Sequence, residues 1–341
     1  MKAGSFDEQA TQHQIAWRRD NITGSEMGWH DGKQYEWILP RDRWEEGLWP
    51  SIRTGTSSAL TSYLETNRVQ KHRSSGNLKS SWMLRANFYF PFRDTERGRE
   101  LLAGFLREKV HPDIASLESL ELEYEAPGEL APQVLLGETG GRRGAGQTSP
   151  DVAFLMNDGE GLVLTECKFT EHSFYRCSAR VRSDHRGRAG NPDPSRCLRP
   201  ESVFENPLAL CHQTVWKRRY WEHLFPVLQR ESLDGLTCCP AVHAGYQLFR
   251  QQALAEGIAG TGKHRLVVSC LAVDDRNEEL RACLRTTGID DFRSWGSLFG
   301  GLARFAVFTH GDWVAWVRDN DSLGHWSSWL TWIERRYGYS R

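Results

Sequence analysis

Two acidic residues and a lysine carry the clearest chemical pattern in this chain. Asp151 follows Pro150, and after fourteen intervening residues come Glu166, Cys167 and Lys168. If these residues lie on a strand, Glu166 and Lys168 share one face and Cys167 points to the other. Two carboxylates on a largely apolar face repel each other and are costly to desolvate unless a positive charge lies between them. The pattern therefore predicts a site for a divalent cation.

The donor atoms indicate which cation this would be. The carboxylates of Asp151 and Glu166, with the backbone carbonyl of Cys167, are hard oxygen ligands that suit Mg2+ or Mn2+. A metal held in this way lowers the pKa of a bound water, and Lys168 would orient or activate that water and offset charge developing on a phosphate. This is the chemistry of phosphodiester hydrolysis. A salt-bridged hairpin without activity is the alternative, and we expect catalysis because all three residue types are present.

Regular elements are expected to position these residues. The clearest is a hairpin with arms 152–156 and 162–169, joined by the turn residues 157–161. Apolar spacing and alternation predict further elements around it. These are a strand-like segment over 82–90, a helix over 94–110 that Pro112 ends, a strand over 117–125, a helix over 244–257, and strands over 264–273 and 304–317. The order predicts an α/β fold with a mixed central sheet flanked by helices.

Composition divides the chain into four regions. Residues 1–78 hold five of the fourteen tryptophans and are expected to form an irregular accessory layer pinned by aromatic packing. Residues 79–320 form the predicted core, which an insertion rich in arginine and cysteine interrupts at 174–243. Residues 321–341 contain tryptophans at helical spacing and are expected to form a packing helix.

The spacing of Pro150 and Asp151 from Glu166, Cys167 and Lys168 resembles the signature of the PD-(D/E)XK nucleases, and the resemblance spans residues 80 to 318. A narrower likeness, to bacterial restriction endonuclease-like proteins, rests on short strings around the hairpin. These are Glu166–Glu171, Ser80, Ser81 and Asn87 upstream, and Tyr246, Gln247 and Leu248 downstream. The resemblance implies a restriction-endonuclease-like core, Mg2+-dependent cleavage of DNA, and a role in restriction or defence against phage.

The resemblance also implies further site residues. Members of the superfamily carry another acidic residue upstream of the first aspartate, and Glu123 is favoured for it over Glu96 and Glu100. Gln247 lies where RecB-like members have a helix glutamine close to the site, and is expected to contact nucleic acid. Glu171 would support the metal from outside its coordination shell. For Gln247 and Glu171, a solvated polar side chain explains the residue equally well.

Five of the eight cysteines lie in the insertion, which has too little apolar content for a core of its own. Four thiolates around a structural metal would hold such a segment together, because metal binding supplies folding energy. Zinc is the first choice and an iron–sulfur cluster, which some RecB-like nucleases carry, the second. Ordinary buried thiols are the alternative. The candidate ligands are Cys177, Cys197, Cys211 and, from the adjacent pair Cys238 and Cys239, Cys239, with His212 and His243 as substitutes.

The insertion also carries a local excess of about five positive charges. Its arginines are Arg176, Arg180, Arg182, Arg186, Arg188, Arg196 and Arg199, opposed only by Asp184 and Asp193. Such a segment can contact a nucleic-acid backbone or simply be a solvated face. We select Arg180 and Arg182 as the predicted contacts, because they follow the Lys168 strand closely.

Composition limits the remaining functions. The net charge of −1 excludes a protein that coats nucleic acid by bulk charge, although it allows a basic patch. No apolar run approaches membrane-spanning length, so we expect a cytoplasmic protein that does not enter a membrane. DNA is the expected partner, with a homodimer and defence-system proteins as further expectations. The rivals are a non-catalytic nucleic-acid-binding subunit and a nuclease that acts on RNA or on branched or modified DNA.

Overall fold

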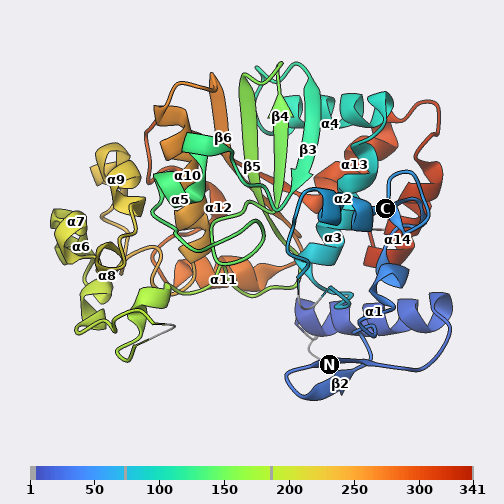
Figure 1. Cartoon of the computed structure of the whole chain (residues 1–341), viewed down its shortest axis with the longest axis horizontal. Helices are drawn as coiled ribbons and strands as arrows, with labels where there is room; N and C mark the ends of the chain where they lie inside the picture. Colours follow the sequence, from blue (N-terminus) through green and yellow to red (C-terminus); the bar gives the residue numbers. More distant parts are fainter. Residues whose placement is uncertain (1–4, 73–74, 185–186, 340–341) are drawn as a thin grey trace.

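A five-stranded mixed sheet forms the centre of the computed structural model, which describes residues 5–72, 75–184 and 187–339 (Figure 1). Its strands, in spatial order, are β3 (Leu117–Leu122), β4 (Val152–Met156), β5 (Gly161–Lys168), β6 (Leu266–Val273) and β7 (Arg304–Thr309). Strand β4 is antiparallel to both of its neighbours, β3 and β5, whereas β6 and β7 run parallel to β5. The predicted mixed sheet flanked by helices is therefore confirmed.

The hairpin of β4 and β5 sets the register of the predicted site. Asn157, Asp158 and Gly159 form its turn with φ angles of 56°, 56° and 85°, a left-handed conformation that these residue types tolerate best. The strands pair Val152 with Thr165. One step further in the same register brings Asp151 opposite Glu166, as the sequence predicts.

Both faces of the sheet are covered, which explains why every residue of β5 is buried. One face packs against α3 (Ser81–Phe88), α4 (Glu96–Lys109), α13 (His310–Asn320) and α14 (Ser327–Tyr337), and the other against α10 (Tyr246–Gly260), α11 (Glu278–Arg285) and α12 (Phe292–Gly296) (Figure 1). Val163 and Cys167 belong to the first core, and Leu162 and Leu164 to the second. The alternation predicted for β5 is thus confirmed.

Two predicted strands are wrong in whole or in part. Residues 82–90 form the helix α3 and the start of a 3-10 turn, and Ser80 caps the helix by accepting a hydrogen bond from the N–H of Met83 at 3.2 Å. This helix is buried on all sides, so its sequence has no polar face to show a helical period. The strand predicted over 304–317 ends at Thr309, where a capping box with Asp312 starts α13.

The N-terminal region is more regular than predicted. It begins with α1 (Phe6–Asn21), and continues with the hairpin of β1 (Gly28–His30) and β2 (Lys33–Tyr35), two 3-10 turns, and α2 (Leu60–Thr66). Helix α1 packs against α14, because Gln14 Nε2 donates to the Arg336 carbonyl at 2.9 Å and the rings of Trp17 and Trp332 lie 5.9 Å apart. The two ends of the described chain therefore lie on the same side of the molecule (Figure 1).

The insertion consists of short helices that extend away from the sheet, on the left in Figure 1. They are α6 (Pro200–Glu205), α7 (Pro207–Leu210), α8 (His212–Val215) and α9 (Tyr220–Leu224); a further short helix, α5 (Pro132–Leu135), precedes the glycine-rich segment 137–146. Tyr220, Trp221 and Leu224 join the core that covers the second face of the sheet. Within the described residues, no helix is long and apolar enough to cross a membrane.

Candidate active site

Three strands of the sheet place acidic residues at one edge. Glu123 follows the end of β3, Asp151 precedes β4, and Glu166 and Lys168 lie at the end of β5. Because these strands are antiparallel neighbours, the three positions adjoin. The N–H of Glu123 donates to the Asp151 carbonyl at 3.1 Å, and the N–H of Cys167 donates to Asp151 Oδ2 at 2.8 Å. The structure thus brings together residues that the sequence spreads over more than forty positions.

Lys168 and Glu166 form a buried ion pair. Lys168 Nζ lies 2.6 Å from Glu166 Oε1, and the two side chains are only 3% and 7% exposed. Burial opposes the charged form of Lys168, but the carboxylates of Glu166 and Glu171 outweigh it and raise the pKa of the lysine. The rings of Phe174 and Tyr175, 5.8 and 5.7 Å from Nζ, add further stabilisation of a cation. Lys168 is therefore an ammonium at neutral pH.

Arg85, on α3, is a site residue that the sequence analysis missed. Its guanidinium pairs with both Asp151 and Glu123, and the side chain is 2% exposed. Its Nε is buried and has no hydrogen-bond partner among the described residues. The available signal was a single charge within the apolar segment 82–90, since a buried charge requires a partner. Because that segment was predicted to be a strand, the partners of Arg85 were not identified.

Glu123 is the upstream carboxylate that the geometry favours, because Glu96 and Glu100 are exposed on α4. Its φ angle is 49°, a left-handed conformation that is uncommon outside glycine. Burial raises the pKa of Glu123 despite the opposing effect of Arg85. The glycine-rich segment covers this residue: Arg143 Nε donates to the Glu123 carbonyl at 2.9 Å, and a Cβ on Gly144 would lie 3.4 Å from the Glu123 carboxyl carbon.

Glu171 has a structural position. Its carboxylate accepts hydrogen bonds from the N–H of Ser81 at 2.9 Å and of Phe169 at 2.8 Å, so it fixes the start of α3 against the end of β5. Burial opposes ionisation of Glu171, but the Lys168 ammonium and these hydrogen bonds hold its pKa below the usual value. Both oxygens of Glu171 are engaged, and its negative charge stabilises the Lys168 ammonium.

The donor chemistry of the site fits a divalent cation. The carboxylates of Glu123, Asp151, Glu166 and Glu171 lie with the cations Arg85 and Lys168, and Arg143 also acts on Glu123. In the described part of the chain, however, no group of three His, Cys, Asp or Glu side chains is placed to hold a metal as it stands. Arg85 already engages Asp151 and Glu123, so a metal at these two residues would take the place of the guanidinium.

The remaining predicted contacts lie outside this cluster. Gln247 is the second residue of α10; its backbone N–H donates to the Phe174 carbonyl at 2.9 Å, and its Oε1 is buried with no partner among the described residues. Arg180 Nη1 lies 3.0 Å from Nδ1 of His243, whereas Arg182 is exposed. Arg186 falls outside the described residues.

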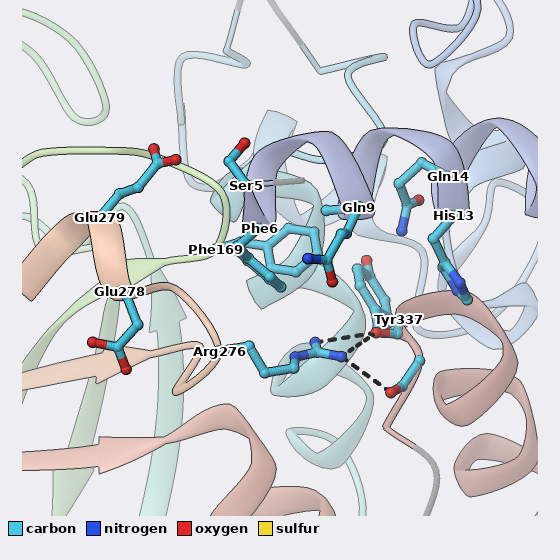
Figure 2. Close-up of a pocket in the computed structure, with 12 residues that line it drawn as sticks. Ser5, Phe6, Gln9, His13, Gln14, Phe169, Arg276, Glu278, Glu279 and Tyr337 are labelled. Carbon is cyan, nitrogen blue, oxygen red and sulfur yellow. Dashed lines mark hydrogen bonds between the residues drawn. The ribbon is translucent and has the colours of Figure 1, made fainter. Parts of the chain in front are cut away.

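A pocket of about 470 Å3 lies between α1, α14 and the loop after β6 (Figure 2). Phe169, which follows Lys168, lines it, but Asp151, Glu166 and Lys168 do not. Arg276 crosses the pocket to donate to the carbonyls of Tyr337 and Gly338, at 3.2 and 3.0 Å from Nη1. The pocket therefore lies where the N-terminal helix α1 meets the C-terminal end of α14, and it does not include the carboxylate cluster.

A family model described as restriction endonuclease associating with ARP matches residues 9–338, which is nearly the whole chain. No curated protein and no solved structure matches it.

Proposed function

Since the chain belongs to the family of restriction endonucleases associating with ARP, we propose that it is a divalent-metal-dependent deoxyribonuclease whose reacting centre is Asp151, Glu166 and Lys168. The observation that carries this proposal is the meeting of the three residues at one sheet edge: Asp151 accepts from the Cys167 N–H, and Glu166 pairs with Lys168 on the adjoining strand. The family match supports a nuclease in general, and the carboxylates and lysine of this site support a divalent metal and a phosphodiester substrate.

Each residue has a separate role in the proposed reaction. Asp151 and Glu166, with the Cys167 carbonyl, would hold Mg2+ or Mn2+, and Glu123 would supply a further carboxylate. The metal, when bound, lowers the pKa of the attacking water and offsets charge on the phosphate. Lys168 is a cation paired with Glu166. Its ammonium would act as a hydrogen-bond donor that orients the water or neutralises a phosphate oxygen.

Arg85 suggests how the site remains stable before a metal arrives. Its guanidinium neutralises Asp151 and Glu123 from α3. Asp151 is the most exposed of the ion-paired side chains in the cluster, at 15%, so a metal would reach the site on its side. Exchange of the guanidinium for the cation would then release Arg85 toward the phosphate, a group that arginine binds well.

The biological setting is part of the proposal. The family is named for endonucleases that associate with ARP, and we extend both the restriction or defence role and such a protein partner to this chain. Cleavage of both strands of a duplex needs two active sites, so we propose a homodimer acting on DNA in the cytoplasm.

The ion pairs of Arg85 with Asp151 and Glu123 favour one alternative function. In that alternative the protein is a nucleic-acid-binding subunit without activity, and Arg85 permanently takes the place of the metal. A substrate panel decides between the two. Purified protein is incubated with supercoiled plasmid, linear duplex, single-stranded DNA and RNA, each with Mg2+, Mn2+ or EDTA. The proposal predicts cleavage of DNA that EDTA abolishes. Cleavage of RNA alone would change the substrate class, and binding without cleavage in either metal would favour the inactive subunit.

A further inference from the structure

Four cysteines from distant parts of the insertion converge at one place. The N–H of Cys239 donates to the Cys197 carbonyl at 2.8 Å, and the N–H of Cys177 donates to the Ala241 carbonyl at 3.0 Å. The side chain of Gln213, two residues after Cys211, donates from Nε2 to the sulfur of Cys177 at 3.2 Å. These bonds tie four segments of the chain, each carrying one cysteine, into a single cluster.

The four cysteines also share one hydrophobic core. Cys177 and Cys239 are buried within it, at 8% and 6% exposure, and Cys197 and Cys211 are partly buried against it. Thiolates gathered in such an apolar place would repel one another, so their ionisation together requires a compensating cation.

The surroundings of the sulfurs suit thiolates better than thiols. The side-chain amide of Gln213 already donates to Cys177 Sγ at 3.2 Å. The indole N–H of Trp221, which is 2% exposed and lies in the same core, has no hydrogen-bond partner in the described part of the chain and is a donor available to a thiolate. A neutral thiol accepts hydrogen bonds weakly, whereas donors converging on sulfur are the typical support of a metal-bound thiolate.

We propose that Cys177, Cys197, Cys211 and Cys239 bind a thiophilic metal, as a structural zinc ion or an iron–sulfur cluster. As the side chains stand, no three of them form a coordination sphere within the described residues. The backbone hydrogen bonds already gather the four positions, and the proposal requires the thiols to turn toward one another when a metal binds. The two histidines are engaged elsewhere: His212 Nε2 lies 2.9 Å from the Ala189 carbonyl, and His243 contacts Arg180.

The position of this cluster gives the metal a structural role that does not depend on the proposed nuclease activity. Cys177 closely follows Phe174 and Tyr175, whose backbones pair with the start of α10 through bonds of 2.8 Å to Ala244 and 3.1 Å from Tyr246. The rings of these two residues lie near Lys168. A metal at the cysteines would therefore fasten the insertion onto α10 beside the sheet edge.

The metal content of the full chain, purified anaerobically without added chelator, tests this proposal. We expect about one zinc per chain, or iron with sulfide and visible absorption, since four cysteines complete either kind of site. Cys211→Ser and Cys177→Ser should lose the metal and speed proteolysis of the insertion. Cys238→Ser is the matched control, because the thiol of Cys238 is directed to the Thr286 carbonyl, 4.0 Å away.

Two results would overturn the proposal. One is wild-type protein that holds neither zinc nor iron and takes up neither Zn2+ nor iron and sulfide on reconstitution. The other is metal that persists equally in Cys177→Ser, Cys211→Ser and Cys238→Ser. The metal content of the wild type decides the question even if a variant fails to fold, and the element found distinguishes zinc from an iron–sulfur cluster.

Discussion

The ammonium of Lys168 lies 2.6 Å from the carboxylate of Glu166, two residues earlier on the same strand and on the same face of the sheet. Both side chains are buried, so the pair is held in low dielectric and each charge depends on the other. This relationship makes Lys168 a fixed positive charge at the point where a phosphate would be cleaved, and it determines what substitutions there should do.

Replacement of Lys168 tests whether this residue acts as a positive charge or as a base that removes a proton. Lys168→Met removes the ammonium and should lower the rate of DNA cleavage by roughly 100-fold or more, the usual cost of losing one preorganised donor. Lys168→Arg keeps a positive charge and should retain part of the activity, because the residue does not need to lose a proton. Exposed Lys33→Met is the control. If Lys168→Arg were as inactive as Lys168→Met although folded, and the pH profile of the wild type showed a titrating base, Lys168 would be the base.

Substitution of Arg85 should make the stability of the folded protein depend on Mg2+. Arg85→Met leaves Asp151 and Glu123 buried without their counter-charge, which should destabilise the protein by about 3 kcal/mol or more in the absence of metal. Mg2+ should restore a large part of that stability, because it can replace the guanidinium. Thermal unfolding with and without Mg2+ measures both effects, with exposed Arg265→Met as control. An equal response of wild type and Arg85→Met to Mg2+ would show that the cation does not bind there.

Burial of His310 next to the Lys168 strand should make the folded protein less stable at acid pH. Its Nε2 lies 3.1 Å from the Lys168 carbonyl and must donate, so Nδ1 accepts from the hydroxyl of Tyr89 at 2.7 Å, and the ring is neutral. Burial lowers the pKa of His310 to about 4. As the pH falls from 6.5 toward 4, the unfolded chain binds a proton that the folded chain does not, so stability falls, by about 2 kcal/mol at pH 5.

Urea unfolding at pH 7.5 and pH 5 checks this sign. His310→Gln should lose less stability between the two pH values than the wild type, because it removes the titrating group and keeps a donor for the Lys168 carbonyl. A wild type whose loss matches that of His310→Gln would exclude His310 as the source.

Arg182 tests whether the insertion contacts DNA. Its side chain is exposed, whereas Arg180 is engaged with His243 near the cysteines, so Arg182→Glu is the cleaner substitution. If Arg182 contacts a phosphate, its reversal should weaken binding of duplex DNA and reduce the slope of log affinity against log salt by about 1. Fluorescence anisotropy over a range of salt concentrations measures both. Unchanged affinity and slope would assign this arginine to a solvated face.

The site residues that could be predicted from the sequence are those whose positions depend on a single hairpin, the one formed by β4 and β5. The turn at Asn157 to Gly159 sets the register, and the register places Asp151 near Glu166 without reference to the rest of the chain. Arg85 could not be placed in this way, because it reaches Asp151 from a helix 66 residues earlier. The convergence of the cysteines could not be predicted either, because it depends on packing between segments that are far apart in the sequence.

The errors in secondary structure have a related cause. Short apolar runs do not distinguish a strand from a buried helix. Residues 82–90 are covered on all sides, and the run Trp313 to Val317 follows β7 directly, so both were predicted as strands. In the second case the signal was present, since Thr309 and Asp312 have the spacing of a capping box.

The most direct test of the proposed reacting centre is plasmid cleavage under single-turnover conditions by wild type, Asp151→Asn and Glu166→Gln in Mg2+. Both substitutions keep the size of the side chain and remove one negative charge. We expect metal-dependent cleavage by the wild type, its loss in both variants, and DNA binding that neither variant weakens. Cleavage by Asp151→Asn and Glu166→Gln at the wild-type rate would place the active centre elsewhere in the chain.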